Sequence, residues 1–359
     1  MTFQQKYIKK REVFTVYFHQ LLLLIIHKFH GERSSTAPFY LLKGKKSGQT
    51  IQDVTYFKLH PYFSLYPKLS LDEYNGEILT LLKEGYIEED ESIIILTEKG
   101  SMHMNSMRNP QFNGWLYRGN EHMFWSRIAL VIQTLSHFEA NVHRYVPNQK
   151  NPDIHHFVKG YLFSRDYKSA EFCTNFRQQL LQLLENTKFE NIHREIFVYR
   201  LSGYGRSGLT WEQLARYYNR PLLDIKLLFI ESLHIALSII HDEKFPDLLP
   251  LTKNVEVQTP LTESAMKTYQ LIQKGHTLED IAAIRLLKFN TIEDHIIEIV
   301  SAIRNFPIYS YISNEQVDKV LKISNRLQTK KLKAIREHVP HLSFFQIRIA
   351  LAKGEGANG

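Results

Sequence analysis

The sequence predicts a mainly α-helical protein made of several domains. Apolar residues recur at helical spacing through most of the 359 residues, and capping residues precede many of these stretches. Only residues 86–97 change to the short, β-branched runs that are typical of strands. Hydrophobic residues at 43% and charged residues at 23% are usual for a soluble globular protein. A chain of this length is expected to form two or three domains.

Residues 1–110 are expected to form a winged-helix-like N-terminal domain. Residues 86–97 predict two short strands around an acidic turn, a small β-wing that follows the helices directly. The acidic tip would repel a DNA backbone, so this domain also suits protein binding. Three lysines in the loop KGKKSG could contact phosphates, although we favour a solvated loop. The expected helices cover residues 14–29, 38–42, 50–59 with a cap at Thr50–Asp53, and a stretch that begins at Ser70.

Residues 111–248 are expected to form a central helical domain. Thr210 can cap a short helix, and a turn at residues 219–221 leads to a long apolar helix. Together these elements predict a second helix-turn-helix-like unit. Residues 203–208 match the spacing G-x-G-x-x-G, but no strand precedes them, so they predict an interhelical loop and not a dinucleotide site. The proline-bearing residues 249–260 are expected to be a linker. The other helices are expected over residues 122–138, 172–186 and 194–203.

Residues 261–353 predict a C-terminal helix-turn-helix domain. A first helix ends at Gly275, and Thr277 with Asp280 forms a capping box before a short second helix. Thr291 and Asp294 repeat that pattern before a longer third helix. Further helices are expected behind Ser313, Thr329 and Ser343, and residues 354–359 are expected to be a disordered tail.

Composition and motifs argue against several classes of protein. Cys173 is the only cysteine, so there is no intrachain disulfide and no cysteine-based zinc site, which favours a cytoplasmic protein. The longest apolar run, residues 21–26, is far shorter than the ~20 residues that span a bilayer, and no signal peptide is expected. The chain has no P-loop, G-x-S-x-G or H-E-x-x-H motif. We therefore expect a protein without enzymatic activity, cofactor or metal.

Positive charge suggests where DNA could bind. The net charge is +8, and residues 261–359 carry 14 Lys and Arg against 10 Asp and Glu. Glu293 and Asp294 on the third helix do not suit a polyanion, so the later basic helices are the better candidates, with a solvated helical face as the alternative. The candidate DNA-binding residues are Lys288, Asn290, Thr291 and His295 around the third helix, and Lys322, Arg326, Lys330, Lys331, Lys333 and Arg336 on the later helices.

Residues 275–296 resemble the helicase-type helix-turn-helix domain found at the C-terminus of many RecQ DNA helicases. The whole chain, with LLKGKKSGQTIQDV near its start and LTWEQLA in its centre, resembles the YpbB-like family of Gram-positive bacteria, which are usually encoded next to a RecQ-like helicase. The residues that carry the C-terminal resemblance are Gly275, Leu278, Ile281, Ala282, Arg285, Thr291, Ile292 and His295.

This resemblance implies that a domain fused to the helicase elsewhere is supplied here as a separate polypeptide. We therefore expect a non-catalytic adaptor for a RecQ-type helicase in DNA repair or recombination, which binds the helicase and possibly DNA and has no membrane partner. The alternatives are a helix-turn-helix transcriptional regulator and a scaffold without DNA contact. The oligomeric state and the domain that would bind the helicase do not follow from the sequence.

Overall fold

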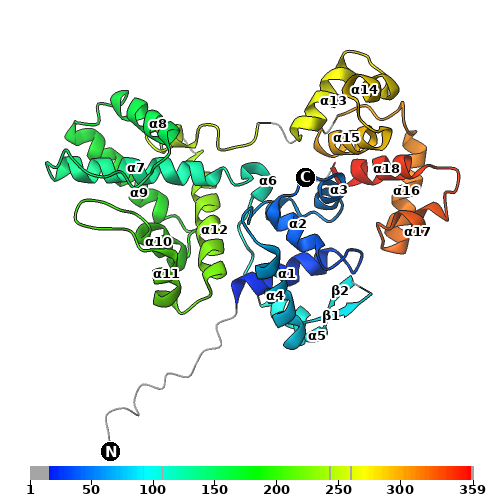
Figure 1. Cartoon of the computed structure of the whole chain (residues 1–359), viewed down its shortest axis with the longest axis horizontal. Coiled ribbons are helices and arrows are strands. Elements are labelled where there is room, and N and C mark those ends of the chain that lie inside the picture. The colour runs from blue at the N-terminus through cyan, green and yellow to red at the C-terminus, as the bar shows by residue number, and fades with distance from the viewer. Residues whose placement is uncertain are drawn as a thin grey trace, which may run out of the picture. The chain divides into compact units, whose positions relative to one another are not determined.

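The computed structural model describes residues 16–91, 93–106, 108–241, 244–258, 261–303 and 305–356. These residues are mainly helical, and the described part contains one two-stranded sheet (Figure 1). The predicted fold class is therefore confirmed. The chain divides into two compact units. The central unit comprises Met1–Leu22, Met102–Phe112 and Gly119–Glu256, and the terminal unit comprises Leu23–Ser101, Asn113–Arg118 and Val257–Gly359.

The central unit is built around one buried helix, α12 (Leu222–Ile240). Nearly every residue of α12 is buried, and it packs against α7, α9, α10 and α11. This burial shows that the long apolar helix after the turn at residues 219–221 serves packing. Thr210 caps α11 as expected. The surrounding helices are α7 (Glu121–Glu139), α8 (Pro152–Phe163), α9 (Ala170–Leu184), α10 (Asn191–Tyr199) and α11 (Trp211–Tyr218).

Much of the stretch expected to be a linker is packed against α7. The 3-10 helix η3 (Leu249–Thr252) contributes Leu251, and Val255 follows it; both side chains are fully buried. Arg127 on α7 donates hydrogen bonds to the carbonyls of Leu251 (2.9 Å) and Lys253 (2.6 Å). These contacts place the segment up to Glu256 within the central unit. The proline-rich composition of this segment did not reveal that Leu251 and Val255 are buried and hold it in the central unit.

The N-terminal part of the terminal unit contains the predicted hairpin. Strands β1 (Ile87–Asp90) and β2 (Ile93–Leu96) pair antiparallel, with Ile87 opposite Leu96, which confirms the two predicted strands. The cap expected at Thr50 is wrong, because Ser47 caps α3 (Gly48–Tyr56) and accepts a hydrogen bond from the Thr50 amide. The other elements are α1 (Tyr17–Lys28), which starts in the central unit, α2 (Ala37–Lys43), η2 (His60–Tyr62), α4 (Leu71–Lys83), α5 (Glu98–Asn105) and α6 (Gly114–Tyr117).

The C-terminal part of the terminal unit is the predicted series of helices. Capping boxes at Thr277 and Ser313 confirm two of the expected starts. The start expected at Thr291 is wrong, because the third helix begins at Phe289 and Thr291 lies inside it. The helices of this C-terminal part are α13 (Glu263–Gln273), α14 (Leu278–Arg285), α15 (Phe289–Ala302), α16 (Asn314–Leu327), α17 (Leu332–Arg336) and α18 (Phe344–Gly356). Residues 354–356 of the expected disordered tail are helical, and residues 357–359 lie outside the described residues.

Helix α3, from the start of the chain, packs against α15 and α18, from its end (Figure 1). The Tyr56 hydroxyl donates a hydrogen bond of 2.9 Å to the Arg348 carbonyl, and Ile51 and Val54 are buried. Residues expected in two separate domains, 1–110 and 261–353, thus contribute to the same compact unit.

Candidate nucleic-acid interface

The helix-turn-helix consists of α14, a three-residue turn and α15. Leu286 ends α14 in the left-handed conformation, with φ of 52°. Lys288 and Asn290 are exposed beside this turn, as the sequence predicted, and Thr291 is half-buried. The same corner also exposes large apolar side chains: Ile284 is 54% and Leu286 is 91% exposed. The corner therefore offers few polar groups to a DNA backbone and a sizeable apolar surface to a protein.

His295, a candidate for reading a base edge, lies inside the domain. It is 7% exposed, and its Nδ1 atom lies 2.9 Å from the Thr268 hydroxyl. Burial and the positive charge of Arg285 lower the pKa of His295 to about 4, so the ring is neutral at physiological pH. Arg285 also donates to the Ser264 carbonyl at 2.8 Å. His295 therefore holds α13 and α15 together and is not available to a base.

The acidic residues of α15 are partly used within the fold. Asp294 forms an ion pair with Arg348 on α18 and does not cap the helix. Glu298 accepts a hydrogen bond of 3.0 Å from the Thr262 hydroxyl at the start of α13. The face of α15 that carries these residues is thus committed to packing, and of its candidates only Lys288, Asn290 and Thr291 reach the surface.

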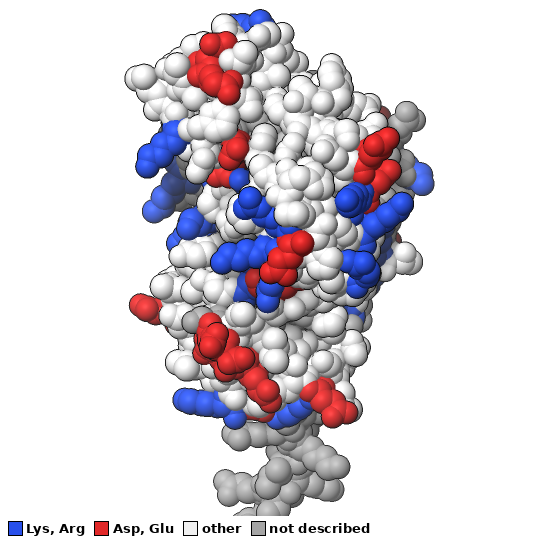
Figure 2. Space-filling view, turned by 90° about the vertical axis from the view of Figure 1, so that its right-hand side faces the viewer, with Lys and Arg blue, Asp and Glu red and all other residues white. Residues whose placement is uncertain are grey.

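The later basic helices keep most of their candidates exposed. Lys322 and Arg326 on α16, and Lys331 and Lys333 at the start of α17, are exposed, and no ion pair joins them to other described residues. Arg336 is also exposed, with its guanidinium 4.5 Å from the centre of the Phe344 ring. Lys and Arg side chains gather across the middle of the face in Figure 2, with acidic side chains above, below and between them.

Acidic residues interrupt this basic surface. Lys322 and Arg326 line an open groove together with Glu315 and Asp318. A groove with both signs of charge attracts a polyanion less than a purely basic one does. The start of α17, with Lys331 and Lys333, is the part of the surface best suited to phosphates.

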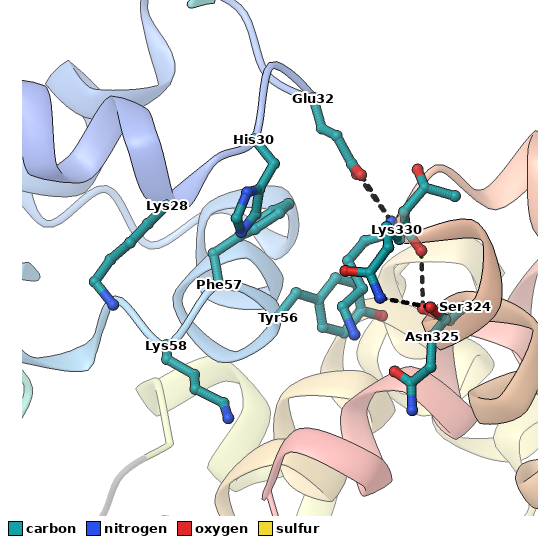
Figure 3. Close-up of a pocket in the computed structure, with 11 residues that line it drawn as sticks. Lys28, His30, Glu32, Tyr56, Phe57, Lys58, Ser324, Asn325 and Lys330 are labelled. Carbon is teal, nitrogen blue, oxygen red and sulfur yellow. Dashed lines mark hydrogen bonds between the residues drawn. The ribbon is translucent and has the colours of Figure 1, made fainter. Parts of the chain in front are cut away.

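Lys330 lines a pocket of about 280 Å³ between the N-terminal and C-terminal parts of the terminal unit (Figure 3). The Lys330 backbone amide donates to both carboxylate oxygens of Glu32, at 3.0 Å each. The opposite wall carries Lys28, whose pKa is lowered by burial and by the nearby charge of Lys58. Lys28 is the last residue of α1 and Lys58 follows the end of α3, so both also complement the negative poles of these helices.

The sequence did not predict that Lys28 and Lys58 line the same pocket as Lys330. Nothing in the local sequence around them indicates that the start and the end of the chain meet here. The lysine-rich loop behaves otherwise: Lys43 donates to the Leu69 carbonyl at 3.4 Å, and Lys45 lies 3.9 Å from the centre of the Tyr40 ring. These lysines are held against the protein surface.

No helix in the described part of the chain has the length and hydropathy needed to cross a membrane. Cys173 is buried, as its place in an amphipathic helix predicts.

Comparison with known proteins supports the C-terminal assignment. Residues 264–351 match a family model described as a helix-turn-helix domain. The chain is 32% identical over 345 residues to Protein YpbB of Bacillus subtilis (strain 168), an alignment that covers 94% of this chain and 97% of that protein. No solved structure is significantly similar. The helix-turn-helix domain and the full-length similarity indicate a DNA-related function.

Proposed function

Because this chain belongs to the family of Protein YpbB, we propose that it is a non-catalytic accessory protein that links a RecQ-type helicase to DNA. The proposal combines the helicase-type resemblance of residues 275–296 with the absence of a P-loop from the sequence. A chain that resembles the accessory domain of a helicase and carries no P-loop is expected to act together with a separate helicase.

The exposed cations of α16 and α17 are the observation that supports DNA contact. Lys322, Arg326, Lys331 and Lys333 are exposed and form no ion pair with other described residues. Unpaired surface cations are the groups that displace counterions from DNA phosphates. The apolar corner at Leu286 lies in the same domain and offers a surface for a protein partner.

DNA contact is tested by measuring the affinity for duplex, forked and single-stranded DNA over a series of salt concentrations. The quadruple variant K322A/R326A/K331A/K333A should bind more weakly, and the slope of log affinity against log salt should fall by up to about 4 units, since each phosphate contact contributes roughly 0.9 for duplex DNA. Lys68 and Lys83 are exposed lysines on other elements, so K68A/K83A is the control. Unchanged binding by the quadruple variant would rule out this surface.

The helicase link is tested by a pull-down from cell extract with nuclease present. Recovery of a RecQ-type helicase supports the adaptor, and L286E, which places a charge on the apolar corner, should reduce that recovery. Repeated failure to recover any helicase would defeat the proposal. A dimer that prefers a palindromic duplex would instead identify a transcriptional regulator.

A further inference from the structure

The central unit contains a pocket of about 450 Å³ that the proposed function does not use. One wall is the loop with the spacing G-x-G-x-x-G, residues 203–208, and the other is residues 145–148. Helix α7 forms the base through Gln133 and His137. The loop joins α10 to α11, so it lies outside any strand–helix–strand unit and is not a dinucleotide fingerprint.

The glycine loop is held in a defined shape. Gly203 and Arg206 exchange backbone hydrogen bonds of 2.9 and 3.1 Å, and the Tyr204 amide donates to the Ser136 hydroxyl on α7 at 2.9 Å. A side chain at position 203 would collide with Ser136, and Gly205 has φ of +69°. The glycines therefore build a tight turn that presents Tyr204, which is 55% exposed, and the exposed Arg206.

The opposite wall is fixed just as firmly. The Gln133 amide donates to the Val146 carbonyl at 3.1 Å and accepts from the Asn148 amide at 2.7 Å. Tyr145 stacks on the buried ring of His137, with 4.3 Å between ring centres, and its hydroxyl lies 2.6 Å from that of Thr134. The Tyr204 ring meets His137 edge-on at 5.8 Å. Two tyrosines thus contact one buried histidine: Tyr145 lines the pocket, and Tyr204 lies beside it on the glycine loop.

The charge of the site favours an anion. The residues that line the pocket include Arg206 and no Asp or Glu. Arg144 and Lys150, which flank the wall at residues 145–148, are both exposed. Aromatic rings for bases, with cations for the backbone and no carboxylate, are the features that bind single-stranded nucleic acids.

We propose that this pocket and the adjacent Tyr204 bind single-stranded nucleic acid, with a base stacked on the exposed Tyr204 ring and a backbone phosphate at Arg206 in the pocket. The fixed walls lower the conformational entropy lost on binding, because the loop need not be ordered by the ligand. The site lies on different elements from the cations of α16 and α17, so the two surfaces can be tested separately.

The test measures the affinity of the full chain for a fluorescent oligothymidylate and an oligouridylate of about 20 nucleotides, at low salt. The variants Y204A and R206A should each weaken binding, by about tenfold for the lost stacking contact, since stacking contributes roughly 1–3 kcal/mol per base and 1.4 kcal/mol corresponds to tenfold. Y309A removes a tyrosine that is 83% exposed in the terminal unit and should bind as the wild type does.

The variant K322A/R326A/K331A/K333A separates this inference from the proposed function. Loss of duplex binding in that variant, with a Tyr204-dependent affinity for the single strand retained, supports the pocket. Wild-type affinity in both Y204A and R206A overturns the pocket and leaves the proposed function standing. Absence of single-strand binding by the wild type overturns the pocket as well. Unchanged melting temperatures exclude misfolding of the two variants, whose side chains are exposed.

Discussion

Several buried polar contacts of the central unit converge on the acidic residue Glu231. Its side chain is fully buried on α12, where it pairs with Arg108 and lies 3.1 Å from His193 Nε2. The Tyr17 hydroxyl also donates to it, at 2.7 Å. Burial alone would raise the pKa of Glu231, but His193 and Arg108 outweigh it and lower the pKa to about 2. The carboxylate therefore stays charged and ties residues near 17, 108 and 193 to the central helix.

We expect the substitution E231Q to lower the free energy of unfolding by about 3 kcal/mol, because it removes the buried counter-charge of Arg108 and leaves it only the half-exposed Glu190. Urea denaturation followed by circular dichroism measures this. The control is E263Q, which removes an exposed partner of Lys267 and should change little. Equal effects of the two substitutions would contradict the assigned role of Glu231.

His295 predicts how stability depends on pH. Its pKa is lowered from 6.5 to about 4 in the folded state, so the unfolded chain takes up a proton first as the pH falls. The stability that it contributes is present above pH 6.5 and is lost as the pH falls toward 4. Between pH 7 and pH 5 the wild type should lose on the order of 1–2 kcal/mol more stability than H295Q.

The measurement is urea denaturation of both proteins at the two pH values. I292V, a substitution of a fully buried residue on the same helix, is the control because it should lower stability equally at both. Parallel losses in the wild type and H295Q would show that His295 does not couple folding to pH in this range.

At the scale of elements, most helices follow from the sequence because the signals for them are local. Apolar spacing and caps such as Thr277 and Ser313 lie within a few residues of the helix that they start. The predictions were wrong where a residue distant in the sequence determines the role of a side chain. Thr291 resembles a cap, but Asp294 pairs with Arg348 far along the chain. His295 resembles an exposed reader of bases, but Thr268 and Arg285 enclose it.

The two threonines give a matched test of capping. T277A removes the hydroxyl that accepts from the Asp280 amide at 3.1 Å, so it should lower stability by about 1 kcal/mol. T291A changes a residue inside α15, where alanine has the higher helix propensity, so it should cost much less. Thermal melting of both variants is the measurement. A larger loss of stability in T291A than in T277A would show that Thr291 caps α15, as the sequence predicted.

At the scale of the whole molecule, the candidate sites could be predicted in part. The basic residues of α16 and α17 stand out in the sequence because their charges are close together. The pocket at Lys28, Lys58 and Lys330 does not, because it forms only when the two ends of the chain meet. The pocket between residues 145–148 and the glycine loop was also hidden, because its two walls come from segments that are distant from each other in the sequence.

The dependence of the C-terminal helices on α3 can be measured directly. Residues 257–359 produced alone lack Ile51, Val54 and Tyr56, which are buried in the intact chain. We expect this fragment to melt at a lower temperature than the full chain and to bind a hydrophobic dye, because faces of α15 and α18 are uncovered. Adding residues 1–118 as a separate polypeptide should reduce dye binding. A fragment that melts like the full chain would show that α3 is dispensable.

The hydrogen bond between Tyr56 and Arg348 also has a consequence for protein synthesis, because it joins residues 292 positions apart. At ~5–20 residues per second, a ribosome needs roughly 15–60 s to add the intervening chain. During that time the apolar face of α3 has no α15 or α18 to cover it. The nascent chain therefore leaves this face exposed or bound by a chaperone, and the terminal unit closes only after α15 and α18 have been synthesised.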